Sequence, residues 1–204
     1  MKKENKKSIL IAVPCFGANI DSHTAGAIYA SGIMLQEKGI SNGLYFVNNE
    51  SFIPSARNRI AYEFLASDFT HLMSIDADIG FQPQDILALL EMDKEFCAAN
   101  YNAKTKESRP TVVYSPTTHE PEYIGMGFVL LEKSVFEKIA PITENFISPS
   151  SWGNVKYYNF FGPIIKEKAL LTDDFSFCER WKKVNGKIYL NEKIKLIHYG
   201  KYGY

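Results

Sequence analysis

Asp76 and Asp78 are the residues whose types and spacing most directly suggest chemistry. They close the apolar run of THLMSIDADIGF (70–81) and lie one residue apart. Side chains alternate along a strand, but at a strand end the backbone turns and both carboxylates can approach one hard cation. Mg²⁺ and Mn²⁺ suit such a site because they keep coordination positions open for substrate phosphates. The structural alternative is that both aspartates cap loop amides.

Two later segments add groups of the same kind. LLTDDFSFCERW (170–181) places Asp173 and Asp174 at an expected helix start, and LIHYG (196–200) places His198 at the end of an expected strand. Each has an ordinary explanation, since aspartates cap helices and a single histidine is usually a satisfied polar residue. Together with the aspartate pair of residues 76 and 78, they nevertheless form a pattern.

The elements that position these groups alternate between strand and helix in the first half of the chain. That rhythm predicts an α/β fold with a largely parallel sheet and helices on both faces, whose ligands bind beyond the carboxyl ends of the strands. Ser55 is expected to cap its helix. The expected strands are 8–13, 44–47, 70–75 and 96–101, and the expected helices are 24–38, 56–66 and 83–92.

The second half of the chain is less regular. Residues 141–163 form a Pro-, Gly- and aromatic-rich stretch without a clear period. We expect a single domain over 1–204, with a nucleotide-binding half to about residue 105 and an acceptor-side half from about 106. The expected strands of this half are TVVY, YIGMGFVLL and KIYL, and the expected helices are SVFEKI and DFSFCERWKKV.

Composition limits the classes of function. The chain has 204 residues, with 46% hydrophobic and 23% charged residues, as in ordinary globular proteins. Lys plus Arg and Asp plus Glu both number 23, so a nucleic-acid partner is not favoured. Three scattered cysteines suit a reducing compartment, and no apolar run approaches the roughly 20 residues that cross a bilayer. We therefore expect a cytoplasmic protein without a transmembrane segment.

Six segments in this order resemble the GT-A glycosyltransferases, and in particular small viral and bacterial members such as chlorovirus glycosyltransferase domains. The resemblance covers most of the chain and implies the GT-A fold, with a nucleotide-sugar donor linked to UDP or GDP and a glycan or other hydroxyl acceptor. The six segments are SILIAVPCFG, PSARNRIAYEFL, THLMSIDADIGF, YIGMGFVLLEKSVF, TDDFSFCERW and HYG.

The resemblance also implies a metal site for Mn²⁺ or Mg²⁺. Asp76 and Asp78 match the DxD pair, with Asp78 as the direct ligand and Asp76 nearer the donor ribose or sugar, and His198 completes the site. An imidazole, carboxylates and diphosphate oxygens form a credible shell for Mn²⁺. Arg57 would lie near the diphosphate or the donor sugar, where a guanidinium can hold phosphate. Alternatively, Arg57 pairs with a nearby acid of its helix region, Glu63 or Asp68.

The same resemblance implies an inverting reaction in which Asp174 removes the proton of the acceptor hydroxyl and Asp173 orients it or the acceptor. Many relatives carry Glu at the position of Asp173. This departure leaves the assignment of the base between the two aspartates open.

The remaining implied residues concern the donor and the acceptor. Gly127, in GMGF, would form a wall beneath the donor sugar where a side chain would block close approach, or else a strand bulge. The nucleotide base would rest on the loop after the first strand, formed by Pro14, Cys15 and Phe16. An aromatic-rich loop would stack on an acceptor sugar, and its residues are Trp152, Tyr157, Tyr158, Phe160 and Phe161. For each of these residues taken alone, packing in the core is the ordinary role.

Three other classes of function were weighed. A haloacid-dehalogenase-type phosphatase also carries DxD after a buried strand, but it wants the motif on the first strand and Thr or Val where this chain has Gly80. No GxGxxG follows SILIAV, which excludes a dinucleotide-dependent oxidoreductase. A binding module without catalysis would have little reason to keep all three polar segments, so a transferase is favoured.

Overall fold

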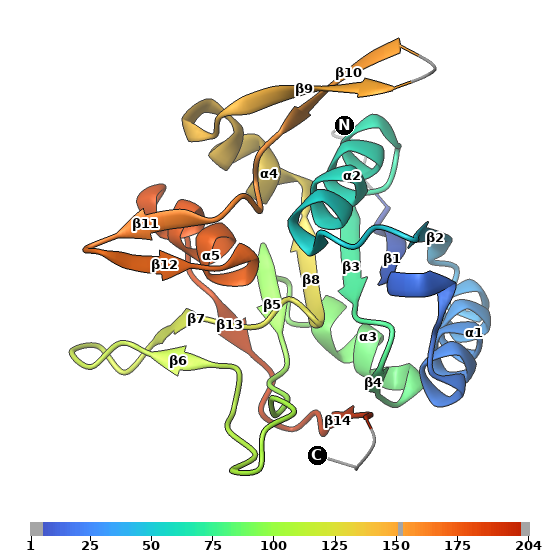
Figure 1. The fold of residues 1–204 in the computed structure, drawn as a ribbon. Helices are drawn as coiled ribbons and strands as arrows, with labels where there is room; N and C mark the ends of the chain where they lie inside the picture. Colours follow the sequence, from blue (N-terminus) through green and yellow to red (C-terminus); the bar gives the residue numbers. More distant parts are fainter. Residues whose placement is uncertain (1–5, 151–152, 201–204) are drawn as a thin grey trace, which may run out of the picture.

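The computed structural model describes residues 6–150 and 153–200, which are built around one central six-stranded sheet (Figure 1). The strand order is β13-β5-β8-β3-β1-β2. The mixed, mostly parallel α/β architecture predicted from the sequence is confirmed. The strands are β1 (Ser8–Cys15), β2 (Ser41–Asn48), β3 (His71–Ile75), β5 (Phe96–Ala98), β8 (Phe128–Glu132) and β13 (Tyr189–Leu190).

One strand of this sheet runs against the others. β1 is parallel to β2 and β3, and β13 is parallel to β5, whereas β8 lies antiparallel between β3 and β5. The β3–β8 register pairs Ile75 with Phe128. The residues that follow β3 therefore lie beside those that precede β8, and the amide of Asp76 donates to the carbonyl of Gly127 at 2.9 Å.

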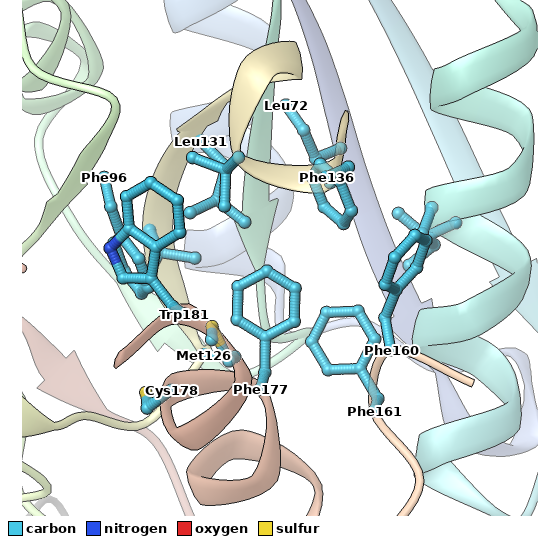
Figure 2. Close-up of a cluster of buried hydrophobic side chains, with 14 of the residues drawn as sticks. Leu72, Phe96, Met126, Leu131, Phe136, Phe160, Phe161, Phe177, Cys178 and Trp181 are labelled. Carbon is cyan, nitrogen blue, oxygen red and sulfur yellow. The ribbon is translucent and has the colours of Figure 1, made fainter. Parts of the chain in front are cut away.

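Helices cover both faces of the sheet because alternate strand side chains enter two separate cores. Ile9, Ile11 and Val13 of β1 pack with α1 (Ser22–Glu37) and α3 (Pro83–Leu90). Leu10 and Ala12 belong to the other core, which α2, α4 and α5 cover. Figure 2 shows the aromatic centre of that second core, around Phe136, Phe160, Phe161, Phe177 and Trp181. The bounds are α2 (Ile53–Ala66), α4 (Lys133–Ile139) and α5 (Asp173–Lys183).

Two helix starts differ from the sequence prediction. α1 begins at Ser22, where the Asp21 carboxylate accepts from the His23 amide at 2.8 Å. α2 begins at Ile53, and Ser55 lies inside it instead of capping it, with its hydroxyl donating to Glu50 Oε2 at 3.1 Å. The prediction of a Ser55 cap is therefore wrong, because the helix begins at Ile53, before Pro54, and includes Ser55.

The irregular second half contains short hairpins. The aromatic-rich stretch forms β9 (Asn145–Ser150) and β10 (Gly153–Tyr158), a two-stranded antiparallel ribbon that projects from the body in Figure 1. Trp152 lies outside the described residues. The remaining elements are β4 (Ile79–Gly80), β6 (Val113–Tyr114), β7 (Pro121–Tyr123), β11 (Ile164–Lys166), β12 (Ala169–Leu171), β14 (Ile197–His198) and the 3₁₀ turns η1 (Phe16–Ala18) and η2 (Ala140–Ile142).

One pair of these short strands joins segments that lie far apart in the chain. β14 pairs antiparallel with β4, so that His198 lies opposite Ile79, and the amide of Tyr199 donates to the carbonyl of Asp78 at 2.8 Å. The carboxyl end of the described chain is thereby tied to the loop after β3. Within the described part of the chain, no helix combines the length and apolar character that a membrane span requires.

Candidate active site

The β4–β14 pairing brings Asp78 and His198 together. His198 Nε2 lies 3.3 Å from Asp78 Oδ1. The other ring nitrogen, Nδ1, lies 2.9 Å from the carbonyl oxygen of Asn102. A carbonyl only accepts, so Nδ1 carries the hydrogen in this contact and, in the neutral ring, Nε2 presents its lone pair toward Asp78. Two lone pairs facing each other at this distance need a proton or a cation between them.

Asp78 also contacts a lysine. The Lys104 ammonium contacts Asp78 Oδ2, the carboxylate oxygen that His198 leaves free. Burial would raise the pKa of Asp78, but the hydrogen bonds from His198 and Lys104 outweigh it and hold that pKa below its usual value. Asp78 is therefore an ionised carboxylate, with the Lys104 ammonium at one oxygen and the His198 ring at the other.

Arg57 is the buried cation of the site. Its side chain is 4% exposed, and it donates from Nε to Asp173 Oδ2 at 3.1 Å and from Nη2 to Asp76 Oδ1 at 3.0 Å. Burial alone would lower the pKa of Arg57, but the surrounding carboxylates raise it above its usual value. The alternative in which Arg57 pairs with Glu63 or Asp68 is wrong, because the side chain of Arg57 turns inward toward β3 and α5.

Asp174 occupies an unusual electrostatic position beside this pair. Its Oδ1 is buried and finds no hydrogen-bond partner among residues 6–150 and 153–200. It lies 3.4 Å from Arg57 Nε, but the single Nε hydrogen is donated to Asp173. The side chain as a whole is 21% exposed, so its accessible surface belongs to its other atoms. Burial raises the pKa of Asp174 to about 7, and the charges of Asp173 and Asp76 add to this effect while Arg57 opposes it.

Gly125 and Gly127 make room for Tyr101, a residue that the sequence analysis did not single out. A Cβ on Gly125 would lie 2.5 Å from the Tyr101 hydroxyl oxygen, and one on Gly127 would lie 2.6 Å from it and 2.7 Å from Asp76 Oδ2. The Gly127 amide donates to the same hydroxyl at 3.1 Å. The Tyr101 ring also packs edge-on against His198, with ring centroids 5.2 Å apart. Side chains of the protein itself thus fill the space above the two glycines.

A cleft of about 590 Å³ joins most of the expected site residues. Phe16 lines this cleft and is 73% exposed. Of the residues implied by the resemblance, the cleft is lined by Pro14, Phe16, Arg57, Asp76, Asp78 and His198, and Lys104 also lines it.

The remaining expected residues lie elsewhere. Cys15 is 3% exposed and packs in the core between the sheet and α1. Asp173 and Asp174 adjoin the cleft through Arg57. Phe160 and Phe161 are core residues, and Tyr157 of β10 packs against Tyr62 of α2. For these three aromatic residues the structure therefore shows ordinary packing.

The residues present fit a divalent cation that is held only partly by protein. Within residues 6–150 and 153–200, no three His, Cys, Asp or Glu side chains gather into a complete cage. Asp78 and His198 supply one carboxylate and one imidazole, and Lys104 already places a positive charge on Asp78. Asp76 instead faces Arg57. Mg²⁺ and Mn²⁺ are commonly bound by few protein ligands with substrate phosphates and water completing the shell.

The chain is similar to known proteins in its fold, and not in its sequence. No protein-family profile and no curated protein sequence matches the chain. A solved structure of A197 from STIV matches with a TM-score of 0.58 and 16% identity, over 95% of this chain and 86% of that one. A mutant of Drosophila β1,4-galactosyltransferase 7, in complex with manganese, UDP-Gal and xylobiose, matches with a TM-score of 0.52 and 14% identity. That match covers 92% of this chain and 66% of the galactosyltransferase chain. The chain thus has the GT-A-like fold expected from its sequence.

Proposed function

We propose that this protein is a metal-dependent glycosyltransferase that moves a sugar from a UDP- or GDP-linked donor to the hydroxyl of a glycan or another acceptor. The observation that carries the proposal is the contact of Asp78 with His198 in a cleft that Arg57 and Asp76 also line. The two groups come from chain segments that lie far apart in the sequence, after β3 and in β14. They face the end of the sheet where α/β folds bind ligands.

The donor side is formed mainly by the chain to about residue 105, to which β14 adds His198, and the acceptor side by the other residues from about 106 onward. The exposed ring of Phe16, with Pro14 beside it, offers an apolar surface on which a nucleotide base can stack at one end of the cleft. The galactosyltransferase of similar fold is itself a complex with UDP-Gal. The diphosphate of a donor lying along the cleft would then reach Asp78 and His198.

Asp78 and His198 would hold the metal ion, Mn²⁺ or Mg²⁺. When bound, this ion acts as a Lewis acid and neutralises the charge that develops on the leaving diphosphate. The Asn102 carbonyl fixes the ring of His198 and the hydrogen on its Nδ1. Asp76 has a different task under this proposal, since its carboxylate is held by Arg57 and orients the guanidinium.

Asp174 is the better of the two candidate bases. Asp173 Oδ2 already accepts the Nε–H of Arg57, so this oxygen is occupied and less available to receive a proton from an acceptor. Asp174 Oδ1 has no hydrogen bond, and the carboxyl has a pKa of about 7, close to the value at which a general base works best near neutral pH. Asp174 would accept the acceptor proton as the hydroxyl attacks the anomeric carbon in line, which inverts the configuration.

A direct test incubates the protein with Mn²⁺ and a panel of nucleotide sugars and follows release of the nucleoside diphosphate. We expect turnover of one donor, and loss of roughly a hundredfold or more in the Asp174→Asn variant. Asp68→Asn changes an exposed carboxylate at the end of α2 and serves as the control. Unchanged turnover in both Asp174→Asn and Asp78→Asn would refute the mechanism. Tight binding of a nucleotide sugar without turnover would indicate a binding module instead.

A further inference from the structure

The two permanently charged cations that line the cleft differ in how readily they can bind a ligand anion. Among the described residues that line it, the permanently charged cations are Arg57 and Lys104. Arg57 was expected at the diphosphate, but it is 4% exposed and already donates to Asp76 and Asp173. Moving it to a phosphate would leave buried carboxylates without a partner, which is costly. Lys104 pairs with Asp78 and its side chain is 33% exposed, so among these lining cations it is the one that can turn to an incoming anion.

Lys104 lies on a loop that is attached to the candidate metal ligands. The loop between β5 and β6 is closed by a bridge between Asn102 and Pro110 and by the Ala103 amide, which donates to the Arg109 carbonyl at 2.8 Å. The Asn102 carbonyl, two residues before Lys104, is the partner of His198 Nδ1. The loop thus holds one ligand through its backbone and the other, Asp78, through the Lys104 ammonium.

The ammonium and a divalent ion would compete for the same carboxylate. Lys104 contacts Oδ2 of Asp78, and His198 faces Oδ1. A metal ion at this carboxylate would repel the ammonium at close range. It would also neutralise the negative charge of Asp78 that now attracts Lys104. The Lys104 side chain is 33% exposed and has a flexible four-carbon stem, so it can leave without disturbing the fold.

We propose that Lys104 exchanges partners during donor binding: it pairs with Asp78 before the metal binds, and afterwards it binds the diphosphate of the nucleotide donor. This inference rests on the proposed function. The lysine ammonium neutralises the Asp78 carboxylate until the metal ion binds together with the diphosphate. Because it then faces a phosphate instead of a carboxylate, its charge is never left unpaired in the cleft.

The exchange predicts opposite effects on two affinities when the charge of Lys104 is removed. Lys104→Met frees Asp78 for the ion, so we expect Mn²⁺ alone to bind roughly two- to fivefold more tightly. The same variant lacks the phosphate partner, so UDP or GDP in the presence of Mn²⁺ should bind roughly tenfold more weakly. The loss should be smaller for UMP or GMP, which lack the second phosphate. Calorimetry measures all of these affinities without turnover.

Two variants serve as controls. Lys106→Met removes a positive charge from the same exposed loop two residues away, outside the lining of the cleft, and should leave each affinity within about twofold. Lys104→Arg keeps the charge and should restore most of the diphosphate affinity.

The outcomes separate this inference from the proposed function. If the wild-type protein binds Mn²⁺ and a nucleoside diphosphate but Lys104→Met changes neither affinity, the exchange is refuted and the proposed function stands. The exchange is also refuted if the variant binds Mn²⁺ more weakly, because Lys104 would then only support the loop. A wild-type protein that binds neither Mn²⁺ nor UDP nor GDP would overturn both proposals.

Discussion

Arg57 and Asp173 lie 116 positions apart in the chain, and the guanidinium Nε donates to the Asp173 carboxylate at 3.1 Å in the interior of the protein. The same guanidinium donates to Asp76 at the end of β3. One buried cation therefore joins the strand that carries the DxD pair to the helix start that carries the proposed base. The positions of both carboxylates depend on it.

Loss of this cation should destabilise the fold. Arg57→Met removes the positive charge from beside three carboxylates, and uncompensated buried charges cost about 3–5 kcal/mol in the free energy of unfolding. Urea denaturation at neutral pH measures this change. Arg59→Met, at an exposed position of the same helix, should cost less than about 1 kcal/mol. A loss for Arg57→Met as small as that of the control would show that the cluster contributes no net stability.

Removal of the Asp174 charge should stabilise the protein at alkaline pH. The pKa of Asp174 is about 7 against a usual value of 3.8, so the folded state binds more protons than the unfolded state between these values. Stability contributed by the protonated carboxyl is therefore lost as pH rises toward 7. We expect Asp174→Asn to have a higher Tm than wild type at pH 8, with the difference shrinking toward pH 4. A constant difference across this range would contradict the raised pKa.

The rate of sugar transfer should rise with pH through about 7. A base must be ionised to accept a proton, and the pKa of Asp174 places that change near neutrality. The measurement is kcat/KM for the active donor between pH 5.5 and 9 at fixed Mn²⁺. A rate that is already at its plateau at pH 5.5 would assign the base to a carboxylate with an ordinary pKa and exclude Asp174.

Gly127, which lies next to Asp76, should tolerate no side chain. A Cβ at Gly127 would overlap the Tyr101 hydroxyl and Asp76 Oδ2, so Gly127→Ala should lower the free energy of unfolding by about 1–3 kcal/mol. Adding Tyr101→Phe removes the overlap with the hydroxyl but keeps the ring carbon Cζ, 2.8 Å from the Cβ position, so it should restore only part of the loss. In contrast, Gly26 lies in α1 with no atom within 4 Å of its Cβ position, and Gly26→Ala should stabilise by about 0.5–1 kcal/mol. Equal effects at the two glycines would contradict the described packing.

The fold could be predicted where the chain alternates regularly. The strands and helices of the first half follow from short β-branched runs and apolar periods, and the structure has them within a few residues. β9 and β10 could not be predicted, because this ribbon projects from the body and lacks a buried face that would impose an alternation. The antiparallel direction of β8 also depends on tertiary pairing rather than on local pattern.

The candidate site could be predicted where a metal-binding residue type lies at the end of an expected strand. Asp78 and His198 were expected together and lie together. The inward turn of Arg57 was missed because its partners lie on β3 and α5, beyond any local window. Tyr101 was missed as well, since its role depends on the room that two distant glycines leave for its hydroxyl. Lys104 was not considered, because an exposed loop lysine has no distinguishing sequence signal.

Binding of Mn²⁺ in the presence of UDP or GDP, followed by electron paramagnetic resonance or calorimetry, tests the central claim most directly. Wild-type protein should bind the ion, and Asp78→Asn and His198→Ala should each weaken binding at least about tenfold, as loss of a ligand does. His119→Asn is the matched control, since this exposed histidine has φ 58°, which asparagine adopts readily. Equal Mn²⁺ affinity in wild type, Asp78→Asn and His198→Ala would contradict the account.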